Sequence, residues 1–102
     1  MKTSDDDARL VKALKALADA KRFRMVRELA TAGELSCGQV GERFSLSQPA
    51  ISHHLKILVD AGLLVVRNEG QHHFISVNQE TVRELSALLP ARLASAPKRH
   101  RG

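Results

Sequence analysis

The fold of this chain is decided by residues 36–62, which read SCGQVGERFSLSQPAISHHLKILVDAG. Ser36 followed by Gln39 forms a capping box, in which each side chain hydrogen-bonds a free backbone N–H of the other residue. It predicts a short helix that ends near Phe44. A second helix is predicted for residues 47–61, because its first residue is a serine that can cap it and a proline falls in its first turn. Two helices joined by a short turn predict a helix-turn-helix.

One face of the second helix carries polar side chains that suit DNA. Ile51, Leu55 and Leu58 recur at helical spacing and define the buried face, so the residues opposite them point outward. Glutamine can bond an adenine edge through two hydrogen bonds, and lysine suits a phosphate. The DNA contacts expected from this helix are Ser47, Gln48, Pro49, Ser52, His53 and Lys56. The alternative is a polar face that is simply solvated. His54 lies at the edge of the apolar face and is expected to be a packed structural histidine.

The pattern changes to strand after the second helix. Residues 63–67 and 71–77 are rich in strand-forming side chains, and Asn68-Glu69-Gly70 between them is a turn signal. A hairpin placed after a helix-turn-helix makes the winged form of that motif, with the wing at residues 64–77. Arginine at the wing suits a phosphate or the minor groove. The DNA contacts expected from the wing are Arg67, Asn68, Gly70 and Gln71.

Amphipathic helices flank this motif on both sides, so the predicted fold is mainly α with a small β-hairpin. The first helix begins near Ser4, with aspartates in its first turn, where the helix dipole favours negative charge. The next begins at Asp19, and Phe23, Val26 and Ala30 are predicted to line one face of it, with Met25 and Leu29 adjacent. The last covers residues 79–89 and is ended or kinked by Pro90. The apolar stripes of the first and last helices are Leu10, Leu14 and Leu17, and Val82, Leu85 and Leu89.

Size and charge limit the class of protein. The chain has 102 residues, a formal net charge of +5 and neither Trp nor Tyr. A core this small is marginal, which favours oligomerisation, and the basic surplus favours an anionic partner such as nucleic acid. No apolar run reaches the roughly 20 residues of a membrane span, and the acidic N-terminus is unlike a signal peptide. We therefore expect a cytoplasmic protein with one domain at residues 1–94 and a basic disordered tail at residues 95–102.

Cys37 has two interpretations. A single cysteine excludes an internal disulfide and a cysteine-built zinc finger. It follows a helix N-cap, where the dipole lowers a thiol pKa, so it is a possible thiol sensor. The alternative is a small packed residue, as cysteine often is.

No metal site, cofactor or enzymatic activity is expected. The candidate metal ligands are His53, His54, His72 and His73. Adjacent residues in a strand point to opposite faces, so both members of a pair rarely bind one ion. His73 alternates with Ile75 and Val77 and is expected to pack with them. The sequence contains no Gly-rich phosphate loop and no carboxylate pair near a nucleophile.

The stretch from Leu17 to Val77 resembles the ArsR/SmtB family of bacterial transcriptional repressors. The resemblance is most specific in LSQPAISHHLKIL and in the AGLL and EGQ segments that follow. It implies a homodimeric winged helix-turn-helix repressor that binds an inverted repeat in a promoter, often its own. It also implies dimerisation through the first and last helices, which carry the apolar stripes described above.

The sequence departs from the metal-sensing members of that family. Those members carry Cys-x-Cys, or a first-position Cys, where this chain reads ELSCG, so Ser36 and Gly38 stand at the expected thiolate positions. Another subgroup binds zinc through Asp and His of the last helix, and residues 79–89 contain neither. The inducer is therefore unknown from sequence. The alternative function is a winged-helix module that binds a protein partner without specific DNA binding.

Overall fold

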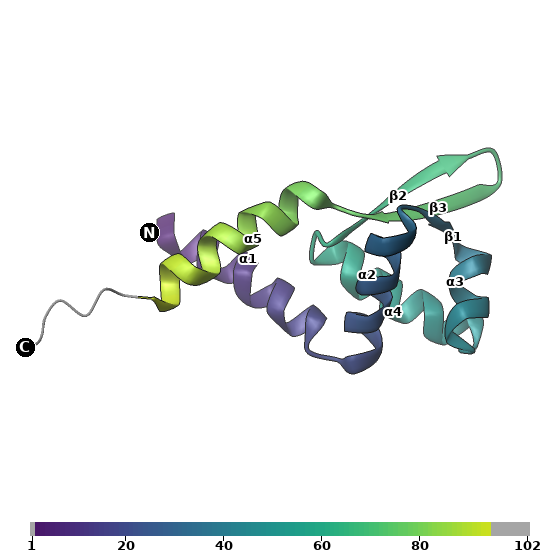
Figure 1. The fold of residues 1–102 in the computed structure, drawn as a ribbon, viewed down its shortest axis with the longest axis horizontal. Helices are drawn as coiled ribbons and strands as arrows, with labels where there is room; N and C mark the ends of the chain where they lie inside the picture. The colour runs from purple at the N-terminus through teal and green to yellow at the C-terminus, as the bar shows by residue number, and fades with distance from the viewer. Residues whose placement is uncertain (1, 95–102) are drawn as a thin grey trace, which may run out of the picture.

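A computed structural model describes the backbone of residues 2–94 and the side chains of residues 5–94. The predicted tail, residues 95–102, lies outside the described residues. Five helices and a small antiparallel sheet follow one another along the chain (Figure 1). The elements are α1 (Lys2–Leu17), α2 (Ala20–Ala32), β1 (Leu35–Ser36), α3 (Cys37–Phe44), α4 (Gln48–Asp60), β2 (Leu64–Glu69), β3 (His72–Val77) and α5 (Gln79–Leu93).

The helix-turn-helix forms as the caps predict. Ser36 Oγ accepts the Gln39 N–H at 3.2 Å, and Gln39 Oε1 accepts the Ser36 N–H at 2.9 Å, which completes the capping box at the start of α3. The turn to α4 passes through Ser45, whose φ of 53° is left-handed. Ser47 then caps α4 by accepting the Ala50 N–H at 3.3 Å.

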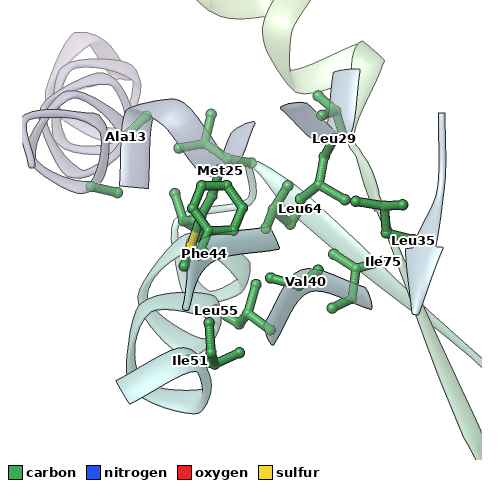
Figure 2. Close-up of a cluster of buried hydrophobic side chains, with 14 residues drawn as sticks. Ala13, Met25, Leu29, Leu35, Val40, Phe44, Ile51, Leu55, Leu64 and Ile75 are labelled. Atoms are coloured by element: carbon green, nitrogen blue, oxygen red, sulfur yellow. The ribbon is translucent and has the colours of Figure 1, made fainter. Parts of the chain in front are cut away.

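The buried side chains of the core come from every element except α5, whose half-buried Val82 and Leu85 pack against them (Figure 2). Met25, Leu29, Val40 and Leu58 are fully buried, and they connect α2 to both helices of the helix-turn-helix. Close packing of this kind fixes the orientation of α4 relative to α2 and α3. The core therefore holds α4 as a rigid element.

The sheet differs from the predicted hairpin in two respects. A third strand, β1, pairs with β3, so the strand order is β1-β3-β2. Strand β2 also continues to Glu69, which pairs with His72, so the turn moves to Gly70 and Gln71. Gly70 has a φ of 60°, the positive value that a two-residue hairpin turn requires. The hairpin of β2 and β3 projects beyond α3 at one end of the domain (Figure 1).

The prediction for the buried face of α2 was wrong. Met25 and Leu29 are buried, whereas Phe23 is 50% exposed and Val26 only half-buried. The reason is tertiary, because α2 turns its Met25 side toward α4 and β3. The helix carries apolar residues on two faces, and its neighbours cover only one.

The outer helices also differ from their predicted form. In α1 the buried residues are Leu10, Ala13 and Ala16, while Leu14 is 41% exposed. Small alanines let α1 approach its neighbours closely, so the buried stripe is rotated from the predicted one. Helix α5 continues past Pro90 for another turn, and the Ala94 N–H bonds the Pro90 carbonyl at 2.8 Å. A proline this near the end removes few helical hydrogen bonds.

Candidate nucleic-acid interface

Helix α4 presents the polar face that the sequence predicts. Ile51, Leu55 and Leu58 are buried against the core. The residues expected to contact DNA from this helix are all exposed: Ser47, Gln48, Pro49, Ser52, His53 and Lys56. This places hydrogen-bonding and basic groups on one side of a rigid, capped helix.

The N-terminus of α4 supplies a further group of donors. Ser47 satisfies the Ala50 N–H and Pro49 has no N–H, so the backbone donors left at this helix start for an anion such as phosphate are those of Ser47 and Gln48. The side chain of Gln48 lies over α3, because a Cβ at Gly41 would stand 3.2 Å from Gln48 Nε2. Lys56 pairs with Asp60 at 3.2 Å, with both side chains exposed. Exposed pairs of this kind are weak, so Lys56 can exchange Asp60 for a phosphate.

The predicted wing residues are brought together, but two of them already have partners. Arg67 binds Glu34 through two hydrogen bonds of 2.9 and 3.1 Å. Asn68 Oδ1 lies 2.5 Å from Nδ1 of His73. Gly70 and Gln71 are exposed at the tip of the hairpin. The prediction that His73 packs was wrong, since its side chain is exposed and contacts Asn68 rather than the core.

His54 is half-buried, as predicted, and belongs to a polar cluster that sequence reasoning missed. Its Nδ1 lies 3.4 Å from Nη1 of Arg22. Arg22 also donates from Nε to the Ala16 carbonyl at 2.7 Å and lies 3.8 Å from Asp19. The arginine therefore links the end of α1, the start of α2 and α4. No local pattern reports this contact, because 32 residues separate Arg22 from His54.

Cys37 is half-buried, and burial raises the pKa of its thiol. A reactive thiolate needs the opposite shift. The environment favours the packed interpretation of Cys37 over the sensor.

An apolar groove of about 350 Å³ lies between α2 and α5. It is lined by Phe23 and Val26 of α2 and by four of the six residues predicted to form a dimer interface, which are Leu17, Val82, Leu85 and Leu89. Leu14 is exposed outside the groove, and Leu10 is 6% exposed and belongs to the protomer core. The unpartnered α2 face and the α5 stripe thus form one continuous apolar surface.

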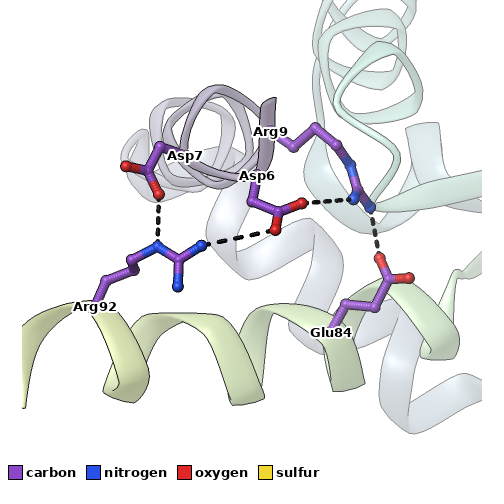
Figure 3. Close-up of polar contacts among 5 residues, drawn as sticks. All are labelled: Asp6, Asp7, Arg9, Glu84 and Arg92. Atoms are coloured by element: carbon purple, nitrogen blue, oxygen red, sulfur yellow. Dashed lines mark hydrogen bonds and ion pairs between the residues drawn. The ribbon is translucent and has the colours of Figure 1, made fainter. Parts of the chain in front are cut away.

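Ion pairs join α1 to α5 (Figure 3). Arg92 binds Asp7 at 2.6 Å and Asp6 at 3.6 Å, and Arg9 binds both Glu84 and Asp6. The predicted start of α1 near Ser4 was wrong, because the helix begins at Lys2 and only Asp5 lies in its first turn. Asp6 and Asp7 instead hold the two outer helices together. Opposite charges on both helices were visible in the sequence, but their pairing depends on the packing of α1 against α5.

Three comparisons place this geometry among known proteins. A helix-turn-helix domain family matches residues 17–67. The arsenical resistance operon repressor of Bacillus subtilis is 38% identical over 70% of this chain and 68% of its own length. The chain belongs to the ArsR family.

Solved structures of ArsR-family regulators share the fold. An ArsR-like transcriptional regulator from Rhodococcus gives a TM-score of 0.80 at 24% identity, covering 88% of this chain and 84% of that one. A homodimeric winged helix-turn-helix DNA-binding domain from Mycobacterium bovis gives 0.72 at 19% identity, covering 97% and 92%. The ArsR family consists of DNA-binding transcriptional regulators and not of enzymes.

Between residues 5 and 94, no three His, Cys, Asp or Glu side chains gather closely enough to hold an ion. The helices of residues 2–94 are all too short or too polar to cross a bilayer.

Proposed function

We propose that this chain is a homodimeric, sequence-specific DNA-binding repressor that acts in the cytoplasm on its own or a nearby promoter. The observation that carries the proposal is the exposed polar face of α4, held rigidly by the core and capped by Ser47. A helix of this kind fits the major groove, where each base pair offers a distinct pattern of donors and acceptors. Gln48 and His53 are assigned to base edges, and Ser47, Ser52 and Lys56 to phosphates or flanking bases.

The wing is assigned to the DNA backbone beside the major groove. Its exposed tip carries Asn68, Gly70 and Gln71, and Arg67 stands on the adjoining strand. Contacts to phosphate carry no base information but fix the register of the recognition helix. The wing therefore supports α4 in the proposed complex.

The dimer is proposed to form over the groove between α2 and α5. Leu17, Val82, Leu85 and Leu89 line it, and Leu14 is exposed on α1. Leu10 is left out because it is buried within its own protomer. A small domain gains stability when such apolar surface is covered by a second copy. A two-fold dimer then presents two α4 helices to an inverted repeat.

Fluorescence anisotropy tests the proposal. The protein is titrated against its own upstream region and against scrambled DNA of equal length at near-physiological salt. A preference of about a thousandfold, the lower end for specific binders, is expected. Equal and salt-labile binding to several genomic fragments would instead favour the alternative, a winged-helix module for a protein partner.

A further inference from the structure

The wing holds a single lysine or arginine, and its charge is already neutralised. Arg67 is the only such residue between positions 64 and 77. Its Nε and Nη2 donate to the two carboxylate oxygens of Glu34, and its Nη1 lies 3.4 Å from a carboxylate oxygen of Glu69. One cation thus faces two anions, and the group of three side chains has a net charge of −1.

The sheet places these groups on one face. Arg67 of β2 is the cross-strand partner of Phe74, and Phe74 is in turn the partner of Ser36 on β1. Glu34 stands two residues before Ser36, so it points to the same face as Arg67. The guanidinium carbon lies 4.6 Å from the centre of the Phe74 ring. The aromatic ring supports the guanidinium, while Glu34 reaches it from the far side of the central strand.

A phosphate would compete with Glu34 for the Arg67 guanidinium, on which Glu34 already occupies two of the five N–H donors. Guanidinium binds carboxylate and phosphate in the same two-pronged geometry, with parallel N–H donors. With Nε and Nη2 bonded to Glu34 and Nη1 lying 3.4 Å from Glu69, a phosphate that approaches Arg67 meets two carboxylates, which repel it. The pair is exposed, so the exchange of carboxylate for phosphate is energetically accessible.

We propose that Glu34 is an intramolecular competitor of DNA phosphate for Arg67 and so limits how strongly the wing binds DNA. This inference rests on the proposed DNA-binding function. In the free protein Arg67 is held by Glu34, and in the complex it moves to the backbone. The contact is sequence-independent, so Glu34 weakens binding to every duplex by the same factor.

The competition has a distinct signature in salt. When Arg67 binds a phosphate it releases about one counterion from DNA, in the natural protein and in Glu34→Gln alike. The slope of log K against log salt should therefore be nearly the same for these two proteins. In Arg67→Gln the slope should become shallower by about 0.9, because one phosphate contact is lost.

The test compares charge-neutralising variants by fluorescence anisotropy on the upstream duplex and on scrambled DNA. Glu34→Gln is expected to tighten binding about two- to fivefold on both duplexes, the range of an exposed ion pair. Glu69→Gln should give a smaller gain, because Glu69 makes only one longer contact. The matched control is Glu80→Gln, which changes net charge equally at the start of α5, and it should alter affinity little.

A double-mutant cycle assigns the effect to Arg67. The gain from Glu34→Gln should disappear in the Arg67→Gln background. If Glu34→Gln and Arg67→Gln each bind DNA more weakly than the natural protein, the pair only stabilises the wing. If Glu34→Gln and Glu80→Gln gain affinity equally, the effect is one of net charge alone. Either result overturns the inference. If the natural protein shows no preference for upstream over scrambled DNA, the proposed function is contradicted instead. The effect of Glu34 can still be measured in that case, because it is expected on scrambled DNA too.

Discussion

Among the charged residues of the helices, Arg22 is expected to give the largest loss in free energy of unfolding when it is neutralised. Its side chain is 16% exposed, and its Nε donates to the Ala16 carbonyl at 2.7 Å. A hydrogen bond from a charged donor contributes about 1.5–3 kcal/mol, and removal leaves the carbonyl without this partner. The longer contacts to His54 and Asp19 add little. Arg22→Gln should therefore lower the free energy of unfolding by about 2 kcal/mol, or Tm by roughly 10 °C.

Urea denaturation at one fixed protein concentration measures this change, since the stability of a dimer depends on concentration. Arg24→Gln is the matched control on the same helix. Its side chain is 57% exposed and pairs with Glu28 at 3.4 Å, so a loss below about 1 kcal/mol is expected. Arg22→Gln should also weaken DNA binding, because the arginine links α2 to His54 on α4. Equal losses of stability for the two variants would refute the reasoning.

Four other predictions address DNA contacts, assembly and titration. Gln48→Ala should reduce the preference for operator over scrambled DNA by roughly 1–3 kcal/mol, whereas Lys56→Ala should weaken both duplexes alike; anisotropy that shows the same loss for both variants contradicts the assignment. Leu89→Ser, in the apolar groove, should shift the protein toward monomer in analytical ultracentrifugation, and an unchanged dimer places the interface elsewhere. Diamide should change the DNA affinity of Cys37→Ser no differently from that of the natural protein, because the raised pKa of the thiol disfavours its reaction. If diamide lowers the affinity of the natural protein but not of this variant, Cys37 is a thiol sensor. The Arg67 guanidinium lowers the pKa of the Glu34 carboxyl, so the ion pair stabilises the fold fully above the ordinary carboxyl pKa and stops doing so as pH falls through the lowered pKa. The difference in stability between the natural protein and Glu34→Gln should therefore shrink below pH 4.5, and a difference that stays constant in urea denaturation would contradict this.

Local signals made the helix-turn-helix predictable. The starts of α3 and α4 are set by residues within four positions of each other, which are Ser36 with Gln39 and Ser47 with Pro49. Both helix starts can therefore be read directly from the sequence. The outward face of α4 followed from its apolar spacing. These elements are the ones on which the proposed DNA contacts depend.

The short strand β1 could not be predicted in the same way. It has two residues, too few to show an alternating pattern, and it exists because Leu35 pairs with Ile75 forty residues later. The pairing also sets the position of Glu34 relative to Arg67. The partner of the predicted wing arginine was therefore hidden until the sheet was known.

The buried face of α2 was missed for a different reason. Both Phe23 and Met25 belong to plausible apolar stripes, and only the positions of α4 and β3 decide which stripe is buried. The exposed stripe has a consequence for assembly, because it lines the groove assigned to the dimer. Phe23 and Val26, which were predicted on the apolar face of α2 but are not buried, thus lie in the proposed interface.

Hydroxyl-radical footprinting of the upstream region tests the central claim most directly. A homodimer that places one α4 helix in each of two successive major grooves should protect two symmetric segments, centred about 10 base pairs apart. Substitution of Gln48 by alanine should weaken both segments together. Uniform protection along the fragment, or one protected segment without a symmetric partner, would contradict the account.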